Sequence, residues 1–156
     1  PGRSRCETGL RQLAGEAQVT EAEIGGKLAV LRDNMDKLAQ IPQASYDEFV
    51  ADFRNVDSAL RRLQTSIQAL IDLAGLTGAR LGLGTSSTSR ELLERLEAAG
   101  VLPAGSTNRF GPIFGFRNRI VHLYDRVDER IVFRILTEER ADLDALARLL
   151  VTALQR

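Results

Sequence analysis

The chain has 156 residues and no tryptophan, and its 21 basic and 21 acidic side chains cancel. This length predicts one domain with a sizeable core. The balanced charge excludes wholesale electrostatic attachment to nucleic acid but allows a local phosphate site. No apolar run is long enough to cross a bilayer, and residues 1–5 lack the apolar core of a secretory signal. We therefore expect a soluble, cytoplasmic protein.

The single cysteine, Cys6, and the single histidine, His122, limit the redox and metal chemistry of the chain. One cysteine cannot form an internal disulfide, which fits a reducing compartment. A structural zinc site needs about four Cys or His ligands, so a zinc site within one chain is excluded. A site built from carboxylates alone stays open. We predict no bound metal and no cofactor.

Helical periodicity predicts an all-α, up-and-down bundle of about five helices. Residues 1–19 show weak periodicity and are predicted to form an extension of uncertain order, ahead of one helical domain over residues 20–156. A capping box at residues 20–23 predicts the start of the first helix, which is expected to end at the Ile-Pro step at 41–42.

A second capping box at residues 45–48 begins the longest apolar stripe, which predicts one helix reaching about residue 81. The glycine-rich loop at 82–87 follows no predicted strand and precedes no Gly-Lys-Ser/Thr, so we do not expect it to bind phosphate. Capping residues at 88–91 and the terminator Gly100 delimit a short third helix.

The fourth helix is expected from about Thr107, and Asp128 is expected to cap the fifth. The fourth carries the segment with the most chemistry, Arg117-Asn118-Arg119-Ile120-Val121-His122-Leu123-Tyr124. Histidine titrates near neutrality and can move a proton in either direction. Arginine can hold a phosphate and stabilise the charge that develops in phosphoryl transfer. This combination suits attack of a ribose 2′-hydroxyl on the adjacent phosphate without a metal.

Helix geometry alone does not assemble these groups into one site. Asn118 and His122 share a face, but Arg117 and His122 lie about 140° apart around the helix axis. An acid and a base also need two titrating groups, and a symmetric dimer would supply the second histidine. Taken alone, the residues favour a structural or solvent-facing His122 over a functional one.

Several arginines crowd the same region: Arg109, Arg117, Arg119, Arg126, Arg130 and Arg134. The planar guanidinium can donate two hydrogen bonds to one phosphate. The alternative for any one of these arginines is a solvated helix face.

The segment at 115–124 closely resembles the signature of the HepT toxins, a group of HEPN helical bundles, which reads R-x-x-x-x-H-x-Y with a polar residue after the arginine. Other stretches also resemble recurrent parts of this family: residues 28–38, 69–74 and 96–103. The resemblance covers about residues 24–154. Two features depart from the family, because the Gly-Leu-Thr-Gly stretch at 75–78 replaces frequent polar residues and residues 1–19 have no counterpart.

The resemblance implies a homodimeric, metal-independent endoribonuclease toxin of a type II toxin–antitoxin system, whose paired motifs form one cleft. It implies that Arg117 and His122 are catalytic and that Asn118 assists them. It further implies that an MntA-like nucleotidyltransferase antitoxin adenylylates Tyr124, and ATP and magnesium would belong to that partner. Together with the arginine cluster, it predicts three RNA-binding residues: Arg119, Arg109 and Arg126.

Two other functions stay open. One is a catalytically inactive HEPN module that binds a nucleotidyltransferase partner or RNA, and the other is a helical adaptor with a structural histidine. The intact Arg117, Asn118, His122 and Tyr124 favour the enzyme, because a vestigial site would be free to lose them.

Overall fold

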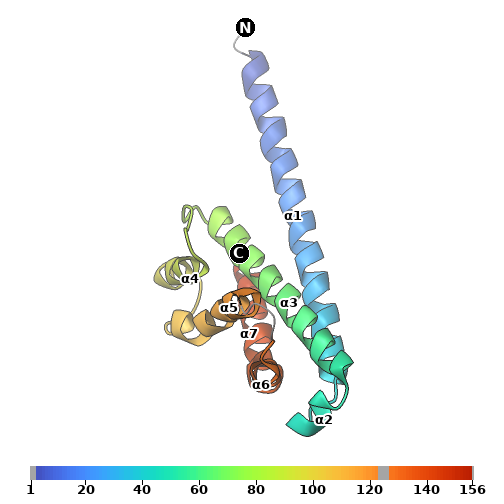
Figure 1. The fold of residues 1–156 in the computed structure, drawn as a ribbon. Helices are drawn as coiled ribbons and strands as arrows, with labels where there is room; N and C mark the ends of the chain where they lie inside the picture. Colours follow the sequence, from blue (N-terminus) through green and yellow to red (C-terminus); the bar gives the residue numbers. More distant parts are fainter. Residues whose placement is uncertain (1–2, 123–126, 156) are drawn as a thin grey trace.

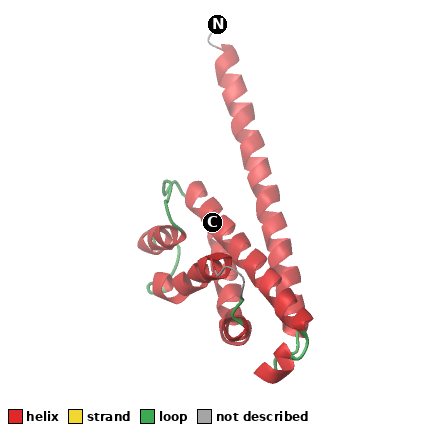
Figure 2. Cartoon of the chain, in the orientation of Figure 1, coloured by secondary structure: helices red, strands yellow, loops and turns green. Residues whose placement is uncertain are grey.

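The computed structural model describes the backbone of residues 3–122 and 127–155, and the side chains of residues 21–116 and 127–155. All regular structure in these ranges is helical, which confirms the predicted all-α bundle (Figure 1, Figure 2). The elements are α1 (Arg3–Gln40), α2 (Tyr46–Val50), α3 (Phe53–Arg80), α4 (Ser89–Ala98), α5 (Ser106–His122), α6 (Glu129–Arg134), the π-helical turn η1 (Ile135–Glu139) and α7 (Arg140–Leu154). In this part of the chain, none of the helices is both long and apolar enough to span a membrane.

Helix α3 lies at the centre of the bundle and packs against α1, α4, α5, α6 and α7 (Figure 1). Helix α1 runs antiparallel to it, because Lys27 pairs with Asp72 at 2.7 Å and Glu21 pairs with Arg80. The guanidinium of Arg80 also donates to the backbone carbonyl of Leu154 at 3.1 Å, so α7 ends beside the end of α3. Arg80 therefore joins the C-terminal ends of α3 and α7 to the middle of α1.

Helix α1 begins at Arg3, well ahead of the start predicted from the capping box at residues 20–23, and that prediction was wrong. Its N-terminal half extends beyond the rest of the bundle (Figure 1). Among the described side chains of α1, Ile24 is the first buried one. Since no core lies alongside the projecting half, that half needs no apolar stripe, and periodicity could not reveal it. The status of residues 1–19 as a separate extension stays a prediction.

The helix predicted over 45–81 is two helices, because the chain turns between α2 and α3. Ser45 caps α2 as predicted, with its Oγ accepting from the Glu48 N–H at 3.1 Å. Asp52 then caps α3 by accepting from the Arg54 N–H at 2.9 Å. An aspartate that bonds nearby backbone amides competes with helix continuation. The apolar spacing runs across the break unchanged, so the period alone could not locate it.

Helix α4 follows the prediction closely. The Thr88 hydroxyl accepts from the Glu91 N–H at 3.1 Å, and Gly100 ends the segment in the left-handed region, at φ 75°. The Glu91 carboxylate accepts from both the hydroxyl and the backbone N–H of Ser87 and from Arg95. These hydrogen bonds, with that from the Ser87 hydroxyl the strongest, lower the pKa of Glu91 to about 2. The carboxylate therefore stays charged, and its hydrogen bonds stabilise the start of α4.

The last helix is capped as predicted, since the Asp128 carboxylate accepts from the Arg130 N–H at 3.0 Å. It is not one regular helix, however, because the π-helical turn η1 separates α6 from α7. A π turn inserts an extra residue and rotates everything after it around the helix axis. The neighbours Ile135 and Leu136, at the start of η1, are both buried. The sequence alone gave no signal for this turn.

Candidate active site on helix α5

Helix α5 carries the segment predicted to do chemistry, and the bundle fixes its position through its start and its inner face. Its inner face is buried against the core at Phe110, Ile113, Phe114 and Phe116. At its start, the Thr107 N–H donates to Glu97 Oε1 on α4 at 2.8 Å. This carboxylate satisfies one of the amides that a helix N-terminus leaves without a partner. The helix is therefore held against α3, α4 and α7.

The backbone of α5 reaches His122, so the helix includes all motif positions from Arg117 to His122. The side chains of these positions lie outside the described residues. Helical register places position 117 on the face of Phe110, seven residues earlier, and places position 119 on the opposite face. Positions 118 and 122 share a third face. The fold thus groups Arg117, Asn118 and His122 within two turns but does not align them on one stripe.

Two predicted residues, Tyr124 and Arg126, lie outside the described residues. Their roles stay predictions. The next described element, α6, begins at Glu129.

Arg109, predicted to bind RNA, lies near the opposite end of α5. Eight residues separate it from position 117, a rise of about 12 Å along the helix. Its Nε and Nη2 donate to Asp142 Oδ1 on α7, at 3.0 and 2.7 Å. The same guanidinium lies over the Phe110 ring, 4.9 Å from its centroid. These contacts give Arg109 a role in joining α5 to α7, while its contact with RNA stays a prediction.

Arg130 occupies the first turn of α6, eight positions after His122 in the chain. Its guanidinium lies 4.3 Å from the centroid of the Tyr46 ring, and that ring meets Phe133 edge-on at 5.7 Å. A cation over an aromatic face is stabilised by about 0.5–1 kcal/mol at an exposed position. The sequence placed Arg130 in the arginine cluster but gave no sign of Tyr46, because the two are far apart along the chain.

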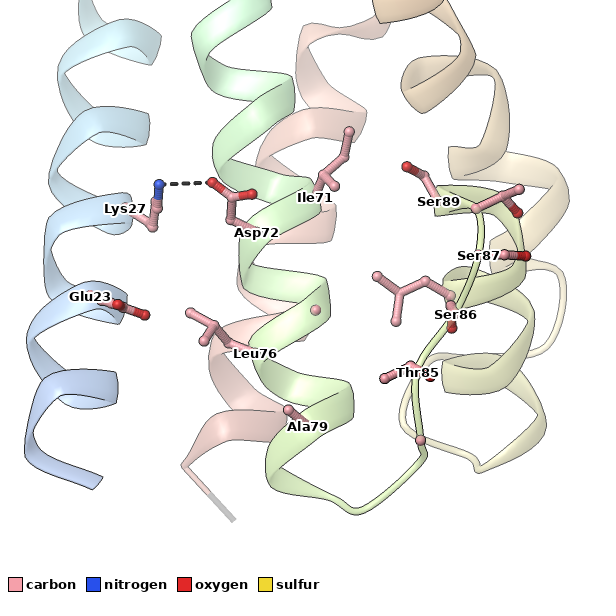
Figure 3. Close-up of a pocket in the computed structure, with 14 residues that line it drawn as sticks. Glu23, Lys27, Ile71, Asp72, Leu76, Ala79, Thr85, Ser86, Ser87 and Ser89 are labelled. Atoms are coloured by element: carbon pink, nitrogen blue, oxygen red, sulfur yellow. Dashed lines mark ion pairs between the residues drawn. The ribbon is translucent and has the colours of Figure 1, made fainter. Parts of the chain in front are cut away.

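Two further features of the described residues concern the binding of a metal ion and of a phosphate group. None of the His, Cys, Asp and Glu side chains described gather in a group of three or more that could hold a metal ion. A cavity of about 720 Å³ lies between α1, α3 and the loop before α4 (Figure 3). The ion pair between Lys27 and Asp72 crosses one side of it, and hydroxyl groups line the other. Because Asp72 neutralises Lys27, this cavity is a poor phosphate site.

The sequence profile of the ribonuclease HepT-like family matches residues 31–150, which is most of the chain. Over 111 residues the chain is 29% identical to the tRNA nuclease HepT of Aphanizomenon flos-aquae, and the match covers 71% of this chain and 76% of that protein. Over 118 residues it is 24% identical to the mRNA nuclease HepT of Shewanella oneidensis, covering 76% and 88%.

Solved structures support the same fold. A toxin–antitoxin complex with AMP-PNP contains a chain that superposes with a TM-score of 0.73 at 21% identity, covering 84% of this chain and 98% of that one. The tri-AMPylated HEPN toxin of Shewanella oneidensis, in complex with MNT antitoxin, superposes with a TM-score of 0.73 at 22% identity, covering 83% and 97%. The family suggested by the motif is thus confirmed over the bundle that carries α5. The chain belongs to the HepT-like ribonuclease family.

Proposed function

We propose that this protein is a metal-independent endoribonuclease toxin whose active site forms around the C-terminal end of α5. The observation that carries this proposal is the intact motif of Arg117, Asn118 and His122 at the end of α5, followed in the sequence by Tyr124, in a chain that matches the HepT-like family over residues 31–150. The nuclease names of two relatives support the same activity.

In the proposed reaction, the 2′-oxygen of a ribose attacks the adjacent phosphorus, and the bond between phosphorus and the 5′-oxygen breaks. A neutral imidazole of His122 accepts the 2′-hydroxyl proton, and a protonated imidazole donates a proton to the departing 5′-oxygen. The products are a 2′,3′-cyclic phosphate and a 5′-hydroxyl. Arg117 stabilises the negative charge on the phosphate oxygens, and Asn118 orients the imidazole that shares its helix face.

Because the chain has one histidine, the base and the acid come from two copies of His122 in a homodimer. The register of α5 supports this arrangement, since positions 117 and 122 are on different faces of one helix. Two helices side by side can bring Arg117 of one copy next to His122 of the other. Arg119 and Arg126 then serve to hold the RNA backbone on either side of the scissile phosphate.

A nucleotidyltransferase antitoxin is the proposed partner, and Tyr124 is its proposed target. The solved complex of a tri-AMPylated HEPN toxin with MNT antitoxin supports this pairing. An adenylyl group on Tyr124 adds negative charge and bulk two residues from His122, and both oppose the binding of an RNA phosphate. The antitoxin therefore blocks the active site by covalent modification.

Inducing the wild-type chain in a bacterial host is expected to arrest growth, and co-expressing a cognate nucleotidyltransferase is expected to relieve the arrest. Intact-mass measurement of the co-expressed toxin should then show an added adenylyl group. The two tyrosines of the chain provide a matched pair of variants. Tyr124→Phe should lose the added mass, and Tyr46→Phe should keep it. Added mass that survives Tyr124→Phe contradicts the assignment of the modified residue.

A further inference from the structure

Helices α1 and α7 both pack on α3 but touch each other little, which leaves a groove of about 650 Å³ between them. The floor of this groove is apolar and half-buried, and it includes Leu28, Met35, Ala147 and Val151. We call it the α1–α7 groove. Its rims carry charged residues from both helices.

The charged residues of the two rims lie at matching heights along the helix axes, which we call levels. Helices α1 and α7 run antiparallel, because α7 begins toward the C-terminal end of α1 and ends beside Glu21, where Arg80 reaches both Glu21 and the carbonyl of Leu154 (Figure 1). The groove therefore runs from the level of Leu28 and Thr152 to the level of Asp36 and Leu143. One turn apart within it lie a basic pair, Arg32 and Arg148, and an acidic pair, Asp36 and Asp144.

Within one copy, therefore, the two rims carry charges of the same sign at each level: positive at one level and negative at the other. The ion pair between Arg148 and Asp144, at 2.9 Å, links the two levels along α7 but leaves 80% and 50% of these side chains exposed. Exposed pairs of this kind contribute little to stability, so they can rearrange at low cost. A partner with the opposite order of charges would therefore neutralise both pairs.

A second copy of this chain, turned by a two-fold rotation, presents that opposite order of charges. A two-fold axis that crosses the groove between the two levels sets α1 against α1 and α7 against α7, each pair antiparallel. It brings Asp36 of one copy to Arg32 of the other, and Asp144 of one copy to Arg148 of the other. The apolar floors then face each other as the core of a four-helix layer. From this complementarity we infer that the α1–α7 groove is a self-association surface.

This surface is separate from the proposed active site. Helix α5 packs on α3, α4 and α7, whereas α1 packs on α3 and α7, so α5 and the groove lie on different flanks of α7. The inference therefore does not rest on the proposed function. A chain that uses both surfaces forms an assembly larger than the catalytic dimer.

The two-fold axis crosses α1 near residue 34 and α7 near residue 146, so residues 28–40 and 140–152 overlap their counterparts, each over about 18 Å. Two helices side by side are about 20 Å wide, so the face buries about 360 Å² per copy, or about 700 Å² in total, which is the size of a weak, transient interface. The association is expected to depend on protein concentration.

Charge reversal tests the inference directly. In a basic-rim variant, Asp36→Arg and Asp144→Arg make both levels positive; in an acidic-rim variant, Arg32→Asp and Arg148→Asp make both negative. By sedimentation, each variant alone should have a lower average mass than the wild type at equal concentration. An equimolar mixture of the two should regain the wild-type mass. Equal masses for variants and wild type, or a mixture that does not associate, would overturn the inference.

Cross-linking separates this surface from any other contact between copies. Ala147 lies on the groove floor close to the proposed two-fold axis, so Ala147→Cys in a Cys6→Ser background should form a disulfide with its counterpart when a mild thiol oxidant such as diamide is added. Ala51→Cys in the same background is the control, because Ala51 is exposed between α2 and α3, far from the groove. RNA cleavage is measured on the same samples. Cross-linking no better than the control contradicts the groove assignment, whether or not the protein cleaves RNA.

Discussion

The variant His122→Ala is expected to cleave RNA at least about 100-fold, and up to about 10⁴-fold, more slowly than the wild type, because it removes both the proton donor and the acceptor. The measurement is the initial rate of cleavage of a mixed RNA substrate by purified protein in excess EDTA. Arg61→Ala is the matched control, since Arg61 is an exposed residue on α3 outside the predicted site. It should cleave at the wild-type rate.

The folded state of each variant must be checked alongside its rate. His122→Ala should melt within a few degrees of the wild type, so that the loss of cleavage reports chemistry and not unfolding. Arg117→Lys adds a second arm, because a lysine keeps the charge but loses the planar fork that can hold a phosphate through two hydrogen bonds. The cleavage rate of Arg117→Lys should lie between those of the wild type and Arg117→Ala. If His122→Ala cleaves as fast as the wild type, the catalytic role of His122 is wrong.

The largest effect on stability is expected for Phe110→Ala. Phe110 is 0% exposed on the inner face of α5, and replacing a buried Phe by Ala typically costs about 3–5 kcal/mol. This is a large share of the roughly 5–15 kcal/mol that stabilises most domains. The variant should also disturb the position of Arg109, whose guanidinium lies over the Phe110 ring. Urea denaturation measures the free energy of unfolding.

Phe53 provides the matched control within the same chain. It is 73% exposed at the start of α3, so Phe53→Ala should change the free energy of unfolding by no more than about 0.5 kcal/mol. A loss for Phe53→Ala as large as that for Phe110→Ala would mean that burial does not explain the stability of the bundle.

Local signals predicted much of the fold. The caps at Ser45, Thr88 and Asp128 and the terminator Gly100 were all visible, because each acts through hydrogen bonds or backbone angles a few residues away. The break at Asp52 was missed because the apolar spacing continues across it. The π turn was missed because the backbone changes its register there while the sequence pattern does not.

The candidate site was predictable only in part. The motif at 117–124 is contiguous, so it could be found by inspection. The pairing of Arg109 with Asp142 could not, since it joins the starts of two helices whose relative placement the sequence does not specify. The α1–α7 groove depends on the same kind of information, because its charge levels exist only once α1 and α7 are set side by side.

The chemistry of the cut ends tests the central claim most directly. Wild-type protein should be incubated with RNA in excess EDTA, and the ends of the products should be identified by mass spectrometry. Attack by the 2′-hydroxyl predicts fragments that end in a 2′,3′-cyclic phosphate and begin with a 5′-hydroxyl. Loss of cleavage on chelation, or fragments with a 3′-hydroxyl and a 5′-phosphate, would contradict a metal-independent reaction that depends on His122.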